Sequence, residues 1–116
     1  MKNILIVDDE KDIREALEGV FRDEGYGVSV AGSSEEALRK LDSSAPDLVL
    51  LDIWLPGMDG VDALKEIKSR FPFLPVIMIS GHANIETAVK TTKLGAYDFI
   101  EKPLSLDKVI LTAEHA

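Results

Sequence analysis

The sequence contains no cysteine, which excludes a disulfide framework, a cysteine-based zinc site and a thiol nucleophile. It also has no long apolar run: residues 4–7 are too few for a signal peptide or a membrane span and lead directly into three acidic residues. Basic residues are in deficit, with 13 lysines and arginines against 21 aspartates and glutamates and a formal net charge of −8. This balance disfavours direct binding to nucleic acid or anionic lipid. We expect a cytoplasmic protein that neither enters a membrane nor binds nucleic acid directly.

The length fits a single domain. With 116 residues, 46% of them hydrophobic, residues 1–116 can bury one core without covalent cross-links. The sequence ends with residues 111–116, inside a segment that has a helical pattern. We therefore expect this domain to be a piece of a longer protein.

Short β-branched runs alternate with amphipathic stretches five times along the chain. Such alternation predicts an α/β fold in which five helices cover both faces of a five-stranded parallel sheet. The predicted strands are residues 3–7, 27–31, 47–51, 76–80 and 97–101. The predicted helices are residues 12–24, 33–43, a stretch between residues 61 and 71, residues 84–95, and a last helix that begins after Ser105. We assume a doubly wound, flavodoxin-like sheet with strand order 2-1-3-4-5.

Several helix ends carry recognisable signals. Ser33 and Glu36 form a capping-box pattern, and Gly25 and Gly95 are placed to end helices. Asn84 is the expected cap of the fourth helix, whose apolar residues 85, 88 and 89 are predicted to face inward.

Polar residues stand where the predicted strands end. Asp8 and Asp9 follow the first strand, Asp52 the third and Lys102 the fifth, while Ser80 closes the fourth. In the assumed strand order these residues meet at one edge of the sheet, where three carboxylates would repel one another unless a hard cation neutralised them. Mg²⁺ suits oxygen ligands and leaves positions for a phosphate. Asp52 is then a candidate nucleophile, with Ser80 and Lys102 facing the phosphoryl oxygens.

Each of these motifs also has an ordinary structural interpretation. Taken alone, residues 8–10 form a solvated acidic turn at a helix start, and Asp52 is a turn residue. Ser80 is a loop hydroxyl, and Lys102 is an exposed lysine before a proline. Both histidines lack the spacing of metal ligands and are predicted to lie on the surface.

Four segments together resemble the receiver domain of bacterial response regulators, the CheY-like family. They are ILIVDDE at residues 4–10, DLVLLDIWLPGMDG at residues 47–60, Ser80-Gly81 and Lys102-Pro103. The resemblance covers the whole chain. Residues 80–104 are further similar to the nitrogen-regulation subgroup, of NtrC/NtrX type.

This resemblance implies roles for individual residues. Asp52 would be the phosphoacceptor, and Mg²⁺ would be held by Asp9, Asp52 and the main-chain oxygen of Trp54, with Asp8 acting through a metal-bound water. Ser80 and Lys102 would bind the phosphoryl group.

Other positions would act in signalling. Phe99 would be the switch aromatic together with Ser80, although many relatives have a tyrosine at that position. Trp54, His82 and Ala83 would influence the lifetime of the phosphoryl group. The resemblance suggests a cis Lys102–Pro103 bond, which the sequence by itself does not decide.

The resemblance also implies partners. A sensor histidine kinase would donate the phosphoryl group, and the domain would catalyse only its own phosphorylation and slow autodephosphorylation. An output domain in the same chain would be controlled by the face made of the fourth helix, the fifth strand and the fifth helix. In this subgroup the output would be an AAA+ σ54 activator with a DNA-binding domain. The same face would support a homodimer.

Three alternatives differ in their sequence requirements. A phosphatase of the haloacid-dehalogenase type would need an acid two residues after Asp52, where Trp54 stands. A nucleotide-binding α/β domain would need glycines after the first strand, where the chain has three acids, and no Walker sequence occurs. A stand-alone receiver without an output domain remains open.

Overall fold

A computed structural model describes residues 2–81 and 85–116 of the chain. It contains a parallel sheet of five strands in the order β2-β1-β3-β4-β5, which confirms the predicted topology. The strands are β1 (Asn3–Val7), β2 (Gly27–Ala31), β3 (Leu48–Asp52), β4 (Val76–Ser80) and β5 (Asp98–Glu101). The helices are α1 (Lys11–Asp23), α2 (Ser34–Ser43), α3 (Gly60–Arg70), α4 (Ile85–Lys93) and α5 (Leu106–His115).

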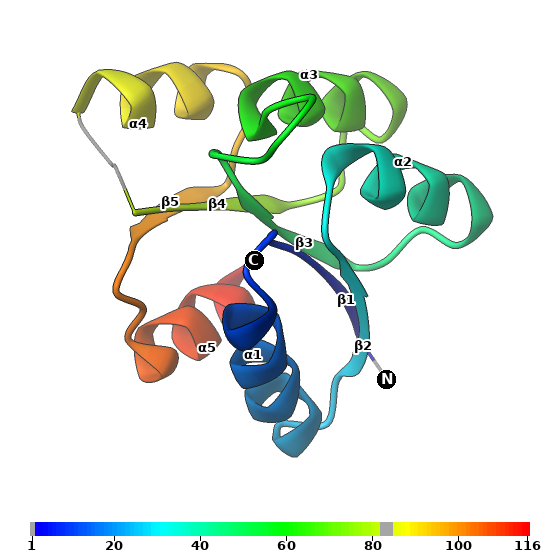
Figure 1. Ribbon diagram of the computed structural model, residues 1–116, viewed down its shortest axis with the longest axis vertical. Coiled ribbons are helices and arrows are strands. Elements are labelled where there is room, and N and C mark those ends of the chain that lie inside the picture. Colours follow the sequence, from blue (N-terminus) through cyan, green and yellow to red (C-terminus); the bar gives the residue numbers. More distant parts are fainter. Residues whose placement is uncertain (1, 82–84) are drawn as a thin grey trace.

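The helices form two layers around the sheet. Figure 1 shows α1 and α5 together on one face and α2, α3 and α4 on the other. Because helices cover both faces, every residue of β3 and β4 is buried, and the two strands are apolar up to their last residues, Asp52 and Ser80. Two separate cores result, one centred on Leu17 and Phe21 of α1 and the other on Leu64 and Ile67 of α3.

The strand ends differ slightly from the prediction. β3 begins and ends one residue later than expected, so that Asp52 is the last residue of the strand instead of the residue that follows it. β5 begins at Asp98, which leaves Tyr97 outside the strand. The pairing of Asp52 with Ile79 holds its backbone in the sheet, so its position is set by strand pairing and not by a flexible loop.

The helix ends follow the local signals, with one shift. Gly25 and Gly95 have φ values of 90° and 105°, as helix-terminating glycines should. Ser33 caps α2 by accepting a hydrogen bond from the amide of Glu36 at 3.2 Å, as predicted. The Glu36 carboxylate, however, accepts from the amide of Gly32 at 3.1 Å and not from that of Ser33. The predicted cap Asn84 lies outside the described residues.

The orientation of α4 differs from the prediction. Ile85 and Val89 were expected to face inward, but they are 84% and 46% exposed, and Ala88 is half-buried. The buried residue of α4 is Thr91, whose hydroxyl is within 3.1 Å of the carbonyl oxygens of Thr87 and Ala88. The helix can bury this hydroxyl because its own backbone supplies the hydrogen-bond acceptors. Its larger apolar residues therefore remain on the outer surface.

Within the two described ranges, none of the helices combines the length and the apolar character that crossing a lipid bilayer requires.

Candidate functional site

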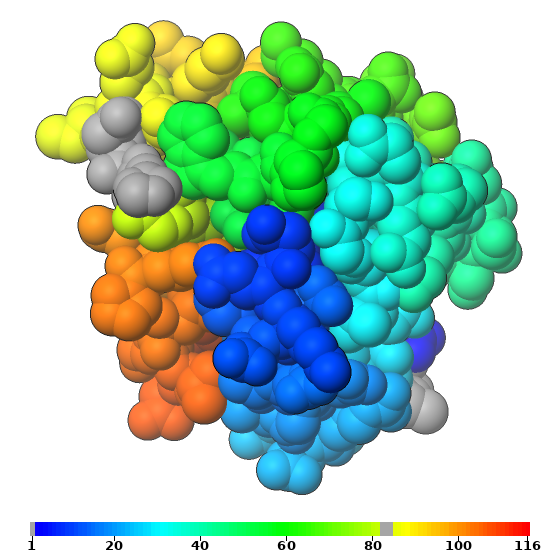
Figure 2. Space-filling view, in the orientation of Figure 1, coloured from blue at the N-terminus to red at the C-terminus, as the bar shows by residue number. Residues whose placement is uncertain are grey.

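The carboxyl ends of β1, β3, β4 and β5 place the predicted polar residues at one edge of the sheet. The register of β1 against β3 sets Asp8 level with Asp52. Lys102 follows the end of β5, and its backbone amide donates to the carbonyl oxygen of Ser80 at 2.8 Å. In Figure 2 the segment after β1 (blue) meets the green and orange segments that follow β3 and β5. The structure thus gathers side chains that are up to 94 residues apart in the sequence.

The amino group of Lys102 is surrounded by three carboxylates. Its Nζ lies 3.0 Å from Oδ2 of Asp8, 3.3 Å from Oδ2 of Asp52 and 3.3 Å from Oε1 of Glu10. Asp8 and Asp52 are buried, whereas Glu10 is exposed. One positive charge therefore faces two buried negative charges and a third at the surface, so the site has an excess of negative charge that a cation can compensate.

Burial dominates the electrostatics of Asp52. Burial and, to a smaller extent, the negative charge of Asp8 raise the pKa of its carboxyl group to about 6, against the opposing effect of Lys102. Burial by itself would lower the pKa of the Lys102 amino group, but its close contact with Asp8 and the negative charges of Asp52 and Asp8 outweigh burial and raise the pKa. Lys102 therefore stays positively charged, and it lies beside an aspartate whose ionised form is disfavoured by its surroundings.

Asp8 is fixed at the centre of the site and retains one under-used oxygen. Its Oδ1 accepts a hydrogen bond from the amide of Glu10 at 2.9 Å, and its main-chain oxygen accepts from the guanidinium of Arg14 at 2.7 Å. Its Oδ2 is buried and forms the ion pair with Lys102, but it accepts no well-aligned hydrogen bond from the described residues. A buried carboxylate oxygen with spare capacity of this kind fits a cation or a cation-bound water.

The segment after β1 supplies an all-oxygen donor set. One carboxylate oxygen from each of Asp8, Asp9 and Glu10 lies within 4.8 Å of the others. Hard cations such as Mg²⁺ prefer such ligands. Asp52 does not belong to this group of three, although it shares Lys102 with Asp8 and Glu10. The residues present therefore fit a divalent cation next to Asp52.

The loop after Asp52 begins with a local hydrogen bond. The amide of Trp54 donates to Oδ1 of Asp52 at 3.2 Å, which orients the carboxylate. Trp54 is 53% exposed, so it is not part of the core. At the other end of the loop Gly60 begins α3, and its amide donates to the carbonyl oxygen of Ile53 at 2.8 Å.

The remaining predicted residues lie along β4 and β5. Ser80 is fully buried at the end of β4. Phe99 is half-buried against the core between the sheet and α3. The Lys102–Pro103 peptide bond is cis, as the resemblance implied. His115 is exposed as predicted, while His82 and Ala83 lie outside the described residues.

A sequence profile of the response regulator receiver domain matches residues 4–114. The chain belongs to this family. Receiver domains are signalling domains of two-component systems and not conventional enzymes, and this one is of the NtrX/NtrC type.

Named relatives support the assignment of this receiver domain. A putative NtrX-like response regulator of Rickettsia bellii is 49% identical over 98% of this chain and 24% of its own length. The crystal structure of the receiver domain of NtrX from Brucella abortus is 54% identical, with a TM-score of 0.92 over 97% of this chain and 95% of that one. The beryllofluoride-activated NtrC4 receiver domain dimer is 41% identical, with a TM-score of 0.94 over 99% and 95%. The chain spans about a quarter of the length of the curated relatives it matches.

Two contacts of this receiver domain were not predicted from the sequence. Glu10 joins Asp8 and Asp52 around Lys102, and Arg14 holds the main-chain oxygen of Asp8. Glu10 carried a signal, since it extends the acidic run after β1. Arg14 carried none, because an arginine one turn into an amphipathic helix is ordinarily solvated.

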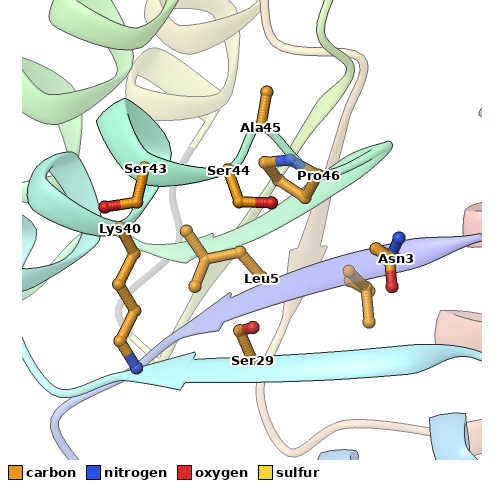
Figure 3. Close-up of a pocket in the computed structure, with 9 residues that line it drawn as sticks. Asn3, Leu5, Ser29, Lys40, Ser43, Ser44, Ala45 and Pro46 are labelled. Atoms are coloured by element: carbon orange, nitrogen blue, oxygen red, sulfur yellow. The ribbon is translucent and has the colours of Figure 1, made fainter.

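The site is distinct from the hollow drawn in Figure 3. That cavity, of about 370 Å³, is lined by the beginning of β1 and the end of α2, including Leu5, Lys40 and Ser43. It shares no residue with the cluster around Lys102.

Proposed function

We propose that this receiver domain accepts a phosphoryl group on Asp52 from the phosphohistidine of a sensor histidine kinase. The observation that carries the proposal is the pairing of a buried aspartate with Lys102, 3.3 Å away, beside a group of three acidic residues at the same sheet edge. In the transfer, an Asp52 carboxylate oxygen forms a bond to phosphorus while the bond from phosphorus to the histidine nitrogen breaks.

The surrounding residues would support this transfer electrostatically. Asp9, Asp52 and the main-chain oxygen of Trp54 are the proposed ligands of Mg²⁺, and Asp8 is proposed to act through a bound water. When bound, Mg²⁺ neutralises charge on the phosphoryl oxygens. Lys102 supplies a fixed positive charge to the same oxygens, and the Ser80 hydroxyl donates to them. The acyl phosphate then loses its phosphoryl group slowly to water.

Phosphorylation would act on the face made by α4, β5 and α5. It adds roughly −1.5 to −2 charges and new acceptor oxygens, which draw Ser80 inward and leave space for Phe99 to rotate. The exposure of Ile85 and Val89 on α4 supports an interaction surface there. The activated NtrC4 receiver is described as a dimer, which supports self-association through this face.

The consequence of the switch would lie in the rest of the protein. The curated relatives are about four times as long as this chain and include an NtrC described as a DNA-binding transcriptional regulator. We propose an output domain in the same protein, of the AAA+ σ54-activator type with its own DNA-binding domain. A receiver with a net charge of −8 would then contribute regulation and not DNA affinity.

Intact-mass analysis with acetyl phosphate and MgCl₂ tests the proposal. The wild-type chain should gain one phosphoryl group, and Asp52→Asn should gain none. Asp42→Asn is the control, because Asp42 forms an exposed ion pair with Arg70 on other elements and should leave phosphorylation unchanged. Asp9→Ala should lose the response to Mg²⁺. Phosphorylation of Asp52→Asn at the wild-type rate would refute the assignment of the acceptor.

A further inference from the structure

The loop between β3 and α3 is attached to a helix that takes no part in the site. Met58, four residues after Trp54, has both backbone polar groups bound by side chains from the first turn of α2. The hydroxyl of Ser34 donates to the carbonyl oxygen of Met58 at 2.8 Å, and the amide of Met58 donates to Oε2 of Glu35 at 3.3 Å. These residues are 24 and 23 positions apart in the sequence, so the contact is purely tertiary.

Burial separates this contact from ordinary surface hydrogen bonding. Ser34 is fully buried, although it is a polar residue in the first turn of a helix. Ser33 already caps α2, so the helix does not need the hydroxyl of Ser34 for its own amides. The one bond that the buried hydroxyl donates crosses to the loop.

The turn in the loop is shaped to receive Glu35. Gly57 has a φ of 73°, a conformation that favours glycine, and a Cβ there would come within 3.0 Å of Oε2 of Glu35. The carboxylate therefore lies directly against the turn. We call the contacts of Ser34 and Glu35 with Met58 the α2 clamp.

The α2 clamp closes a loop that is already fixed at its beginning. The amide of Ile53 bonds to the carbonyl oxygen of Ile79 at 3.0 Å, and the side chain of Leu55 is buried. The peptide of Trp54 lies between these two anchors. The clamp then ties the far half of the loop to α2, which packs rigidly on the sheet through Ala37 and Leu41.

We propose that Ser34 and Glu35 are positioning residues for the cation site, because they hold the loop that presents the main-chain oxygen of Trp54. This inference rests on the proposed function. A main-chain ligand cannot be adjusted by a rotamer change, so its position depends on how the loop is held. Loosening the loop allows the oxygen more positions, and ordering it again on cation binding costs affinity.

A fluorescence titration of the full chain with MgCl₂ tests the clamp, with Trp54 as the reporter because it is the only tryptophan. Ser34→Ala and Glu35→Ala, which remove the donor and the acceptor of the two bonds, should each raise the Mg²⁺ dissociation constant by about three- to tenfold, the range expected for one hydrogen bond. In the metal-free chain, both should also accelerate hydrogen exchange of the Met58 amide. A role of Ser34 in stability alone would lower the melting temperature but leave the dissociation constant unchanged.

Two control variants isolate the effect. Ser43→Ala removes a serine hydroxyl from the other end of α2, where it bonds only within the helix, at 3.3 Å to the carbonyl oxygen of Arg39. Glu66→Ala removes the same side chain and charge from the exposed side of α3 without touching the loop. Both should keep the wild-type dissociation constant.

The outcomes separate the clamp from the proposed function. If the wild-type chain binds Mg²⁺ and both clamp variants have dissociation constants within twofold of the wild-type value, the clamp alone is overturned. If Ser34→Ala does not fold, the surface variant Glu35→Ala decides by the same criterion. A wild-type chain with no response to Mg²⁺ would refute the proposed cation site, and the clamp's role in cation binding with it.

Discussion

At the scale of a single residue, the buried carboxylate of Asp52 lowers the stability of the folded chain. Its side chain is buried next to Asp8, and Lys102 compensates this environment only in part, since the pKa remains raised to about 6. At neutral pH the carboxyl group is ionised in a place that favours its neutral form. A nucleophile needs that ionised form, so function and stability conflict at this position.

The pH dependence of stability follows from the raised pKa. The folded chain binds the proton of Asp52 more tightly than the unfolded chain, whose aspartates titrate near 4. This contribution to folding is fully present below about pH 4 and is lost as the pH rises through about 6. Without divalent cations, Asp52→Asn should therefore raise the free energy of unfolding at about pH 7.5 by on the order of 1–2 kcal/mol.

Urea unfolding at two pH values measures this difference. The advantage of Asp52→Asn over wild type should shrink by at least about half at about pH 4.5, where the wild-type carboxyl group is largely protonated in the folded state. Asp42→Asn, which removes an exposed carboxylate, should change stability by less than about 0.5 kcal/mol at both pH values. An advantage of equal size at both pH values would contradict the assignment of the raised pKa to Asp52.

At the scale of secondary-structure elements, the junction of β3 and α3 depends on the absence of a side chain. A Cβ on Gly60 would come 2.1 Å from the carbonyl oxygen of Asp52 and 2.6 Å from Cα of Ile53. Both are backbone atoms in or next to a central strand, so they cannot move aside cheaply. The first residue of α3 therefore packs directly on the strand that carries Asp52.

Two glycine-to-alanine substitutions compare this junction with an open position. Gly60→Ala should lower the free energy of unfolding by more than about 3 kcal/mol, because backbone must shift. Gly19→Ala, on the exposed side of α1 with no atom within 4 Å of the added Cβ, should raise it by about 0.5–1 kcal/mol. Chemical denaturation of the two variants measures both effects, and a tolerated Gly60→Ala would contradict the packing described for α3.

α4 contributes the fewest buried residues of the five helices. Among its described residues only Thr91 is fully buried, and Ile85 and Val89 lie on the outside. A helix with few buried apolar contacts can shift at low cost. This property suits an element proposed to move between two states.

At the scale of the whole molecule, activation should join two copies of the chain. With Mg²⁺ and beryllofluoride, sedimentation velocity should show a dimer, and Ile85→Lys should weaken it at least about tenfold, because a charge replaces an apolar contact. Ile85→Lys should change monomer stability by less than about 0.5 kcal/mol, since the side chain is 84% exposed.

Phe73→Lys provides the matched control for this prediction. Phe73 is 96% exposed but lies between α3 and β4, at the opposite edge of the sheet from Asp52. The same change of an apolar residue to lysine should there leave the dimer intact. Equal loss of dimer in both variants would show that added charge, and not the α4 surface, is responsible.

The sequence by itself determined the α/β fold, the strand order once a doubly wound sheet was assumed, and the sheet edge that carries Asp8, Asp52 and Lys102. These features follow from local periodicity and from the rule that ligands bind at the carboxyl ends of parallel strands. The prediction that Ile85 and Val89 of α4 face inward was wrong. A periodic pattern identifies an apolar face but cannot state whether the core or another surface covers it.

Only the tertiary structure decided which side chains touch. Glu10 and Asp8 share Lys102, Arg14 holds the backbone of Asp8, and the first turn of α2 binds Met58. No local sequence pattern specifies these pairings. They depend on angles and distances between packed elements, which are set by the sum of many weak interactions over the whole core and by no single motif.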